Sequence, residues 1–253
     1  MNVELRNRFP VILYQMGKVA SSTVSATLDA WGVENYQVHY LNVEQVNAIA
    51  ERREEKSLAR PHHLDRSLEI LKGGILQRPT VKIITMVRDP IARNISAYFQ
   101  NIKIYWGGRD ISEVSSDELV SDFIIRYPHH VPINWFLDEF NPALDLDMFS
   151  IPHDRSAPYF SFAHNNFEIL VMKAEAADVV KREAIADFLG IENRGDLVQG
   201  NVGEGKYYKD SYSAFKEGFQ CPNWYLKIMY GSEYARYFYS QEEIETFRLR
   251  WKS

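Results

Sequence analysis

The sequence lacks several features that would assign it at once to a broad class of protein. Its 253 residues contain one cysteine, Cys221, so an intrachain disulfide and a cysteine-rich zinc site are excluded. No run of about 18 apolar residues occurs, and a strand is expected within about ten residues of the first methionine. These absences leave no room for a signal peptide or a membrane anchor, so we expect a cytoplasmic protein.

Excess basic charge, internal repeats and low-complexity tracts are also missing. The 29 basic and 34 acidic residues leave a net charge of −5, which argues against a broad nucleic-acid-binding surface. Hydrophobic residues make up 45% and aromatic residues 13% of the chain, so a disordered protein is excluded and a large core can form. The length fits a single α/β domain over residues 1–253.

Apolar runs alternate with amphipathic segments, which is typical of a parallel β-sheet flanked by helices. The expected strands are 11–16, 36–40, 80–87, 158–163 and 167–173, the last two forming a hairpin about Asn165-Asn166. The expected helices are 22–31, 43–55, 63–72, 90–104, 116–126, 132–140 and 175–189, with a helical C-terminal region to Trp251. Ligands of such a fold bind at the carboxyl ends of its strands.

A segment with phosphate-binding character follows the first expected strand. Gly17 and Lys18 are followed by Val19, Ala20, Ser21, Ser22 and Thr23, where a helix is expected to begin. Backbone amides at a helix N-terminus can point at an anion, while Lys18 adds a full positive charge. The segment therefore predicts an oxyanion-binding loop.

This loop differs from the common nucleoside-triphosphate loop. That loop has a glycine at the position of Ile12 and a hydroxyl residue at the position of Val19. Because the hydroxyl that would hold magnesium is missing, metal-dependent phosphoryl transfer is disfavoured and no metal is expected. A nucleotide or small-molecule kinase stays an alternative, as does a catalytically inactive nucleotide-binding protein.

A second motif follows the β-branched run 80–87, which is expected to be a central strand. Asp89 suits a helix N-cap and Pro90 suits the first helical position. In the helix that follows we expect Arg93 and Ser96 on the side opposite the buried face. Arg88 and Ser96 are candidate ligands of one phosphate, since the planar fork of arginine matches phosphate geometry.

Together the two motifs resemble those of sulfotransferases that use 3′-phosphoadenosine 5′-phosphosulfate (PAPS). The run Gly17 to Thr23 resembles the family's 5′-phosphosulfate loop, and Arg88-Asp89-Pro90-x-x-Arg93-x-x-Ser96 resembles its 3′-phosphate motif. The resemblance is closest to Golgi-type carbohydrate sulfotransferases and to bacterial relatives linked with surface polysaccharides. It implies a P-loop-like nucleotide-binding fold and transfer of a sulfuryl group from PAPS to an acceptor hydroxyl, that of a sugar.

The resemblance also implies roles for single residues. Gly17, Lys18, Val19, Ala20, Ser21, Ser22 and Thr23, with Arg88 and Ser96, would bind PAPS. Lys18 would also act in catalysis by stabilising charge on the departing bridging oxygen. Related enzymes close over the nucleotide with a basic, glycine-containing loop, and Lys206 in the segment 201–208 would complete the site in this way. A solvated turn is the alternative for that segment.

The acceptor hydroxyl must lose a proton, and His39 is the leading candidate for the base. It ends the second expected strand beside the first loop, and histidine suits proton removal at neutral pH. In glycosaminoglycan sulfotransferases a histidine after the second strand has this role, and Val38-His39-Tyr40-Leu41 is similar to that segment. A histidine that only packs at a strand end is the alternative. His62 and His63 are rivals, whereas His129 and His130 are expected in a loop.

Three further groups have a structural as well as a functional interpretation. Four arginines in and between the second and third expected helices could line an acceptor cleft or form a solvated surface; they are Arg52, Arg53, Arg60 and Arg66. The run 106–109, Trp-Gly-Gly-Arg, predicts either a sugar-stacking loop or a helix stop. The aromatic tail from Tyr207 to Tyr239 predicts core residues and a candidate homodimer surface.

Overall fold

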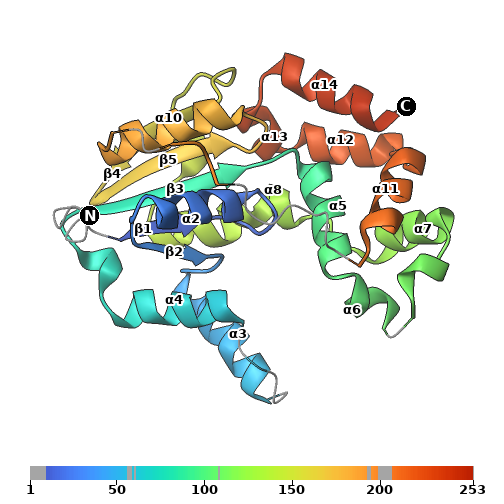
Figure 1. The fold of residues 1–253 in the computed structure, drawn as a ribbon, viewed down its shortest axis with the longest axis horizontal. Coiled ribbons are helices and arrows are strands. Elements are labelled where there is room, and N and C mark those ends of the chain that lie inside the picture. The colour runs from blue at the N-terminus through green and yellow to red at the C-terminus, as the bar shows by residue number, and fades with distance from the viewer. Residues whose placement is uncertain are drawn as a thin grey trace. The chain divides into compact units, whose positions relative to one another are not determined.

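The computed structural model describes residues 10–55, 59, 61–107, 109–192, 195–198 and 207–252. Two compact units divide the chain between them (Figure 1). The first unit comprises Met1–Arg88 and Trp135–Gly200, and the second comprises Asp89–Asn134 and Asn201–Ser253. All strands in the described part of the chain belong to the first unit, and the described part of the second unit is built from helices.

The first unit is organised around one five-stranded sheet with the order β2-β1-β3-β5-β4. Neighbouring strands run parallel except for β4, which pairs antiparallel with β5. The strands are β1 (Val11–Tyr14), β2 (Asn35–Val38), β3 (Val81–Val87), β4 (Tyr159–His164) and β5 (Phe167–Lys173). The predicted mixed α/β architecture with a mostly parallel sheet is therefore confirmed.

Sequence composition explains which strands are central. Every residue of β1 is buried, and β3 and β5 are buried at all but their second positions. Strands that are covered on both faces need such continuous apolar runs. The hairpin between β4 and β5 turns at Asn165, which has a φ of 52°, a left-handed conformation that asparagine tolerates. The predicted Asn165-Asn166 turn is confirmed.

Helices of the first unit cover this sheet. Within the unit, α2 and α4 pack against β2, and α10 packs against β4 and β5 (Figure 1). The π-helical segment Phe136–Phe140 contributes to another contact, because the ring of Tyr14 stacks on Phe140 at 5.0 Å. The helices are α2 (Ser21–Ala30), α3 (Val43–Glu55), α4 (His62–Lys72), α9 (Asn141–Leu144) and α10 (Asp178–Leu189).

The loop after β1 and the residue after β3 lie where the strand order predicts a crevice. From β1 the chain crosses to β2 on one side, and β3 then pairs with β1 on the other side. In an open parallel sheet, such a reversal leaves a crevice at the carboxyl ends of the two strands concerned. The loop after β1 and the residue after β3, Arg88, both lie at these ends.

The second unit has a core rich in aromatic rings. Tyr98 contacts Phe99, Phe123 and Phe215 with ring centroids 5.3–6.4 Å apart. Much of the aromatic tail is buried, as predicted, although Tyr207 and Trp224 are exposed. The helices are α5 (Pro90–Gln100), α6 (Ile102–Trp106), α7 (Ser116–Arg126), α8 (Val131–Trp135, whose last residue belongs to the first unit), α11 (Lys209–Gly218), α12 (Asn223–Gly231), α13 (Glu233–Phe238) and α14 (Gln241–Lys252).

Several predicted boundaries differ from the structure. The helix expected over 90–104 is interrupted at Asn101, so that α5 and α6 are separate. The helix expected over 132–140 changes to a π-helical turn at Phe136. In the run 106–109, Gly107 has a φ of 59° and ends α6, which confirms the helix stop. No helix in the described ranges is long and apolar enough to cross a bilayer.

Candidate functional site

The loop between β1 and α2 bends through two residues in the left-handed conformation. Lys18 has a φ of 74° and Ala20 a φ of 67°. For a residue with a Cβ this conformation costs about 1–2 kcal/mol, so the surrounding structure must impose it. Strain of this kind collects at ligand-binding loops, and here it coincides with the loop selected from the sequence.

Helix α2 begins directly after the strained loop. Its N-cap is Ala20, and no side chain caps the helix. The amides of Ser21 and Ser22 stand at the first helical positions, where no intrahelical acceptor exists. The amide of Thr23 donates to the carbonyl of Ala20 at 3.3 Å, so of the three predicted anion-binding amides it is the one already engaged in the turn.

Side chains of the loop differ in their surroundings. Val19 is fully buried and faces the core, so only its backbone is suited to a ligand. The hydroxyl of Ser21 accepts a hydrogen bond of 2.7 Å from Nε2 of Gln37, which ties the start of α2 to β2. Gly17 and Lys18 are half-buried.

Arg88 joins the two predicted motifs. Its Nη1 donates a hydrogen bond of 2.9 Å to the backbone carbonyl of Lys18. The guanidinium is half-buried at the end of β3, so it lies against the loop after β1. A guanidinium carries five N–H donors in a planar fork, so it can bond more than one acceptor. The structure therefore places the Arg88 guanidinium against the backbone of Lys18 within the first unit.

The other residues of the second motif belong to the second unit. Ser96 is half-buried on α5, and its predicted share in the site of Arg88 stays a prediction. The position predicted for Arg93 is wrong, because this residue is only 7% exposed. Its Nη1 donates a hydrogen bond of 2.9 Å to the hydroxyl of Tyr127. This partner compensates for the burial of the guanidinium, and the helical pattern of the sequence did not reveal it.

Asp89 has a structural role larger than the predicted N-cap. Its Oδ1 accepts from the amide of Ile91 at 3.0 Å, which confirms the cap, and from the hydroxyl of Tyr230 at 2.9 Å. Its Oδ2 accepts from Nε1 of Trp251 at 2.9 Å. The side chain is completely buried, and burial raises its pKa while these hydrogen bonds oppose that change. Asp89 thus holds α5, α12 and α14 together inside the second unit.

His39 lies beside the loop, as the sequence predicted. Its Nδ1 is 2.8 Å from the carbonyl of Gln15, which can only accept, so Nδ1 carries the hydrogen and Nε2 is the basic nitrogen of the neutral ring. A Cβ placed on Gly17 would stand 3.5 Å from Nε2, so the basic nitrogen is close to the start of the loop. This orientation suits a proton acceptor.

One of the rival histidines is a neighbour of His39. The rings of His39 and His63 have centroids 4.7 Å apart, whereas His62 is exposed. Burial lowers the pKa of His63, and the positive charge of Arg53 lowers it further. His129, by contrast, bonds the hydroxyl of Tyr225 at 2.8 Å through Nδ1 within the core of the second unit.

The sequence analysis missed the residues that hold His39 in place. Nε1 of Trp135 donates to the carbonyl of His39 at 3.2 Å. Glu139 is 1% exposed, and its Oε1 accepts from Tyr14 Oη at 2.7 Å and from the amides of Leu41 and Asn42 that follow His39. Burial raises the pKa of Glu139. The available signal was an acidic residue inside the aromatic run 135–140.

Gln15, which precedes the loop, was also missed. Its side chain is completely buried, and neither its Oε1 nor its Nε2 has a hydrogen-bond partner among the described residues. Buried polar atoms without partners are rare in folded proteins and call for an explanation at the site where they occur. A glutamine directly after a strand of apolar residues was the signal in the sequence.

The two remaining site predictions concern Lys206 and the binding of a metal ion. Lys206, with the residues 201–206 of its segment, lies outside the described residues. Within the described ranges, no cluster of three or more His, Cys, Asp or Glu side chains is placed to hold a metal ion.

Comparison with known proteins gives one match. Residues 121–240 match the NKWYS family model, described as "Putative capsular polysaccharide synthesis protein". The match relates this part of the chain to polysaccharide synthesis, and it contains neither of the two predicted nucleotide motifs. No sulfotransferase family model matches the chain. No curated protein and no solved structure matches it significantly.

Proposed function

We propose that the protein is a sulfotransferase that moves the sulfuryl group of PAPS to a hydroxyl of a polysaccharide or of its sugar precursor. The observation that carries the proposal is the hydrogen bond of 2.9 Å between Arg88 Nη1 and the carbonyl of Lys18. It makes the two motifs, chosen separately from the sequence, neighbours at the carboxyl ends of β1 and β3. A donor with phosphate groups on the 3′ and 5′ oxygens of one ribose needs two such anion sites side by side.

The strand order supports a P-loop-like sulfotransferase fold. The reversal between β1 and β3 is where α/β sheets of this kind bind nucleotides. The strained conformations of Lys18 and Ala20 turn backbone groups toward the crevice, and the uncapped start of α2 offers amides to an anion. The relation to capsular polysaccharide synthesis supports a saccharide acceptor.

In the proposed reaction the acceptor oxygen forms a bond to sulfur while the bond from sulfur to the bridging phosphate oxygen breaks. Adenosine 3′,5′-bisphosphate leaves with the electron pair of the broken bond. Lys18 and the first amides of α2 would stabilise the charge on that oxygen. Nε2 of His39 would take the acceptor proton, with Nδ1 held by the carbonyl of Gln15.

A thermal-shift comparison of two nucleotides tests the proposal. Adenosine 3′,5′-bisphosphate without metal should raise the unfolding midpoint, because a ligand that binds only the folded state stabilises it. ATP with magnesium should have a smaller effect. Stabilisation by ATP with magnesium but not by the bisphosphate would instead favour the kinase. Stabilisation by neither nucleotide would reject the nucleotide site.

A direct assay separates an active enzyme from an inactive binding protein. PAPS labelled with ³⁵S should transfer label to unsulfated capsular polysaccharide from the cells that contain this protein. Lys18→Ala should lower the rate by about 10²–10³-fold, as removal of one oxyanion donor does elsewhere. Binding of the bisphosphate without any label transfer would identify a protein that has lost catalysis.

A further inference from the structure

A cleft on the first unit adjoins the histidine pair. Its volume is about 690 Å³, and one face of α3 forms most of its wall together with Tyr40. The residues from α3 recur at intervals of four along the helix, which aligns them in one stripe. Among the described residues, the lining consists of Tyr40, Glu44, Gln45, Ala48, Ile49, Arg52 and Arg53.

The cleft contains two guanidinium groups held by backbone carbonyls. Arg52 Nε donates to the carbonyl of Ala48 at 3.0 Å, and Arg53 Nη1 donates to the carbonyl of Ala59 at 2.6 Å. Neither arginine forms an ion pair with a carboxylate in the described part of the chain. Arg66 on the adjacent α4 is different, because it pairs with Glu69 at 2.7 Å. The two guanidinium groups therefore carry positive charge with which no carboxylate of the described residues forms an ion pair.

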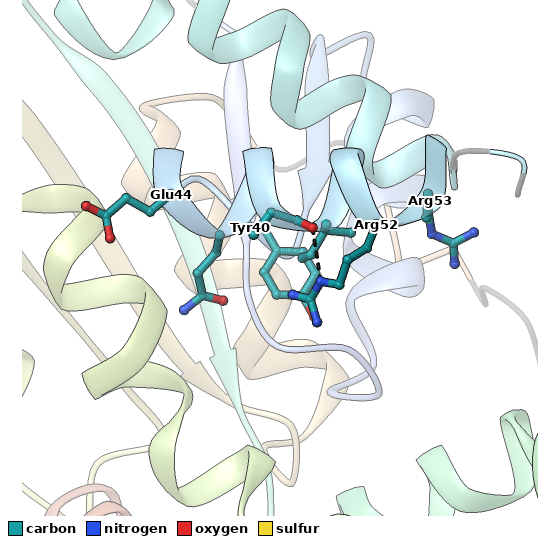
Figure 2. A pocket seen from close by; sticks show the side chains of 7 residues that line it. Tyr40, Glu44, Arg52 and Arg53 are labelled. Atoms are coloured by element: carbon teal, nitrogen blue, oxygen red, sulfur yellow. Dashed lines mark hydrogen bonds between the residues drawn. The ribbon is translucent and has the colours of Figure 1, made fainter. Parts of the chain in front are cut away.

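The acidic residue of the cleft is distant from these arginines along the helix. Glu44 precedes Arg52 by two turns of α3, which is about 12 Å of helix length. Figure 2 shows Arg52 extending beside Tyr40, while Glu44 points away toward the other end of the helix. The end of the cleft beside Tyr40 thus combines the ring of this residue with the guanidinium of Arg52, while Arg53 lines the cleft with its side chain pointing away from them.

The cationic end of the cleft also leads to His39. Tyr40 follows His39 in the chain, and the ring of His63 lies 4.7 Å from His39 and 6.4 Å from Tyr40. Arg53 is close enough to His63 to influence its charge state. A ligand on the ring of Tyr40 would therefore lie near this histidine pair.

We propose that this cleft binds an anionic saccharide chain, with carboxylate groups on Arg52 and Arg53 and the face of a sugar ring on Tyr40. The assignment names the acceptor class of the proposed sulfotransferase and in that respect rests on the proposed function. Guanidinium groups pair with carboxylates through parallel hydrogen bonds, and an aromatic ring offers an apolar face to sugar C–H groups. Nucleic acid fits less well, because its phosphates call for a broad basic surface and the chain has a net charge of −5.

Binding of a fluorescent hyaluronan hexasaccharide to the full chain, without PAPS, tests the assignment. Hyaluronan alternates a carboxylated sugar with a neutral one and carries no sulfate, so maltohexaose serves as its neutral counterpart. We expect the hyaluronan probe to bind at least about tenfold more tightly than maltohexaose, as one lost charged hydrogen bond would predict. Equal affinity for the two probes would overturn the proposal.

Two charge-matched variants locate the binding. Arg52→Gln with Arg53→Gln should weaken the hyaluronan probe about tenfold or more, whereas Arg66→Gln with Lys72→Gln should change its affinity by less than about twofold. Equal losses in both variants would overturn the proposal, because they would reveal an effect of net charge alone. If circular dichroism shows that the Arg52→Gln, Arg53→Gln variant unfolds at a lower temperature than the parent protein, Tyr40→Ala should show the loss of hyaluronan affinity in its place.

Two further outcomes would indicate a different site or a different ligand. The second unit has a smaller cleft of about 290 Å³ that includes Trp106 and Arg109, and loss of hyaluronan binding in Trp106→Ala but not in the α3 variants would overturn the proposal. Equal or tighter binding of a single-stranded dodecathymidylate would overturn it in favour of nucleic acid. The bisphosphate thermal shift is independent of this assay, so failure of the donor site and failure of the saccharide site are distinguishable.

Discussion

The two strand-to-helix crossovers of the predicted site use the N-terminus of their helices in opposite ways. After β1, α2 starts from the strained Ala20 and no side chain caps it. After β3, α5 starts at Pro90 under the carboxylate of Asp89, which also binds Tyr230 and Trp251. An uncapped helix start can serve an external anion, whereas a capped one serves the fold.

Two adjacent residues of the second motif, Arg88 and Asp89, differ in a similar way. Arg88 points to the loop after β1 and bonds the carbonyl of Lys18. The adjacent Asp89 has no exposed surface and is occupied by internal donors. Neighbouring residues of one motif therefore make different contacts: Arg88 lies against the loop after β1, and Asp89 joins helices of the second unit.

The largest expected effect concerns the capped crossover. Asp89→Ala should lower the free energy of unfolding by about 3–5 kcal/mol, because it leaves buried donors of Tyr230 and Trp251 unpaired. Urea denaturation followed by circular dichroism measures the loss. Asp89→Asn retains an acceptor and should cost about 1–2 kcal/mol. If Asp89→Ala matches Asp89→Asn, the carboxylate does not hold the helices together.

The next effect concerns the residue that joins the crossovers. Arg88→Ala should weaken adenosine 3′,5′-bisphosphate binding about tenfold to a hundredfold, the range for one or two charge-assisted hydrogen bonds. Isothermal titration calorimetry gives the affinity. Arg88→Lys keeps the charge but loses the fork, so it should restore only part of the binding. Unchanged affinity in Arg88→Ala would remove Arg88 from the nucleotide site.

A pH dependence is expected near the uncapped crossover. The pKa of His63 is lowered in the folded protein, so the unfolded chain binds its proton first as the pH falls. Stability should therefore decrease below about pH 6.5, and His63→Gln should flatten that decrease. The free energy of unfolding by urea, measured between about pH 7 and pH 5, gives the slope.

Asp65 supplies a second test of the same slope. Its negative charge raises the pKa of His63 and so works against burial. Asp65→Asn should lower the pKa of His63 further and make the pH dependence steeper. An equal slope in the parent, His63→Gln and Asp65→Asn proteins would contradict the placement of His63.

The smallest effect concerns strain in the loop. Ala20→Gly should stabilise the protein by about 0.5 kcal/mol, since relief of the left-handed Cβ exceeds the added freedom of the unfolded chain. Ala26→Gly, within α2, should instead destabilise it by about 1 kcal/mol. Thermal unfolding of the two variants checks the signs. Destabilisation by both would mean that Ala20 is not strained.

Much of the first unit could be predicted from the sequence, because its signals are local. All five strands of the described residues were predicted from the sequence, although β2 is not an apolar run, and Asn165-Asn166 predicted the hairpin. The positions of the loop and of His39 beside it followed from strand order. The strain at Lys18 and Ala20 could not be foreseen, since neither residue is one that usually adopts a positive φ.

Contacts between distant segments were the part that sequence reasoning missed. Arg93 looked like a surface residue until Tyr127 supplied a buried partner. Glu139 acts on Leu41 and Asn42, which lie almost a hundred residues earlier in the chain. A helical or strand period reports which face of an element is apolar, but it does not report which polar group a neighbouring element brings to that face.

The bond between Asp89 and Trp251 joins positions 162 residues apart and has a consequence for biosynthesis. A ribosome synthesises Asp89 long before Trp251, so the carboxylate has to stay solvated until the segment that contains Trp251 has emerged. Strands β1 to β3, in contrast, have all been translated by Val87. Three of the five strands can therefore assemble early in translation, while completion of the helical unit must wait for Trp251.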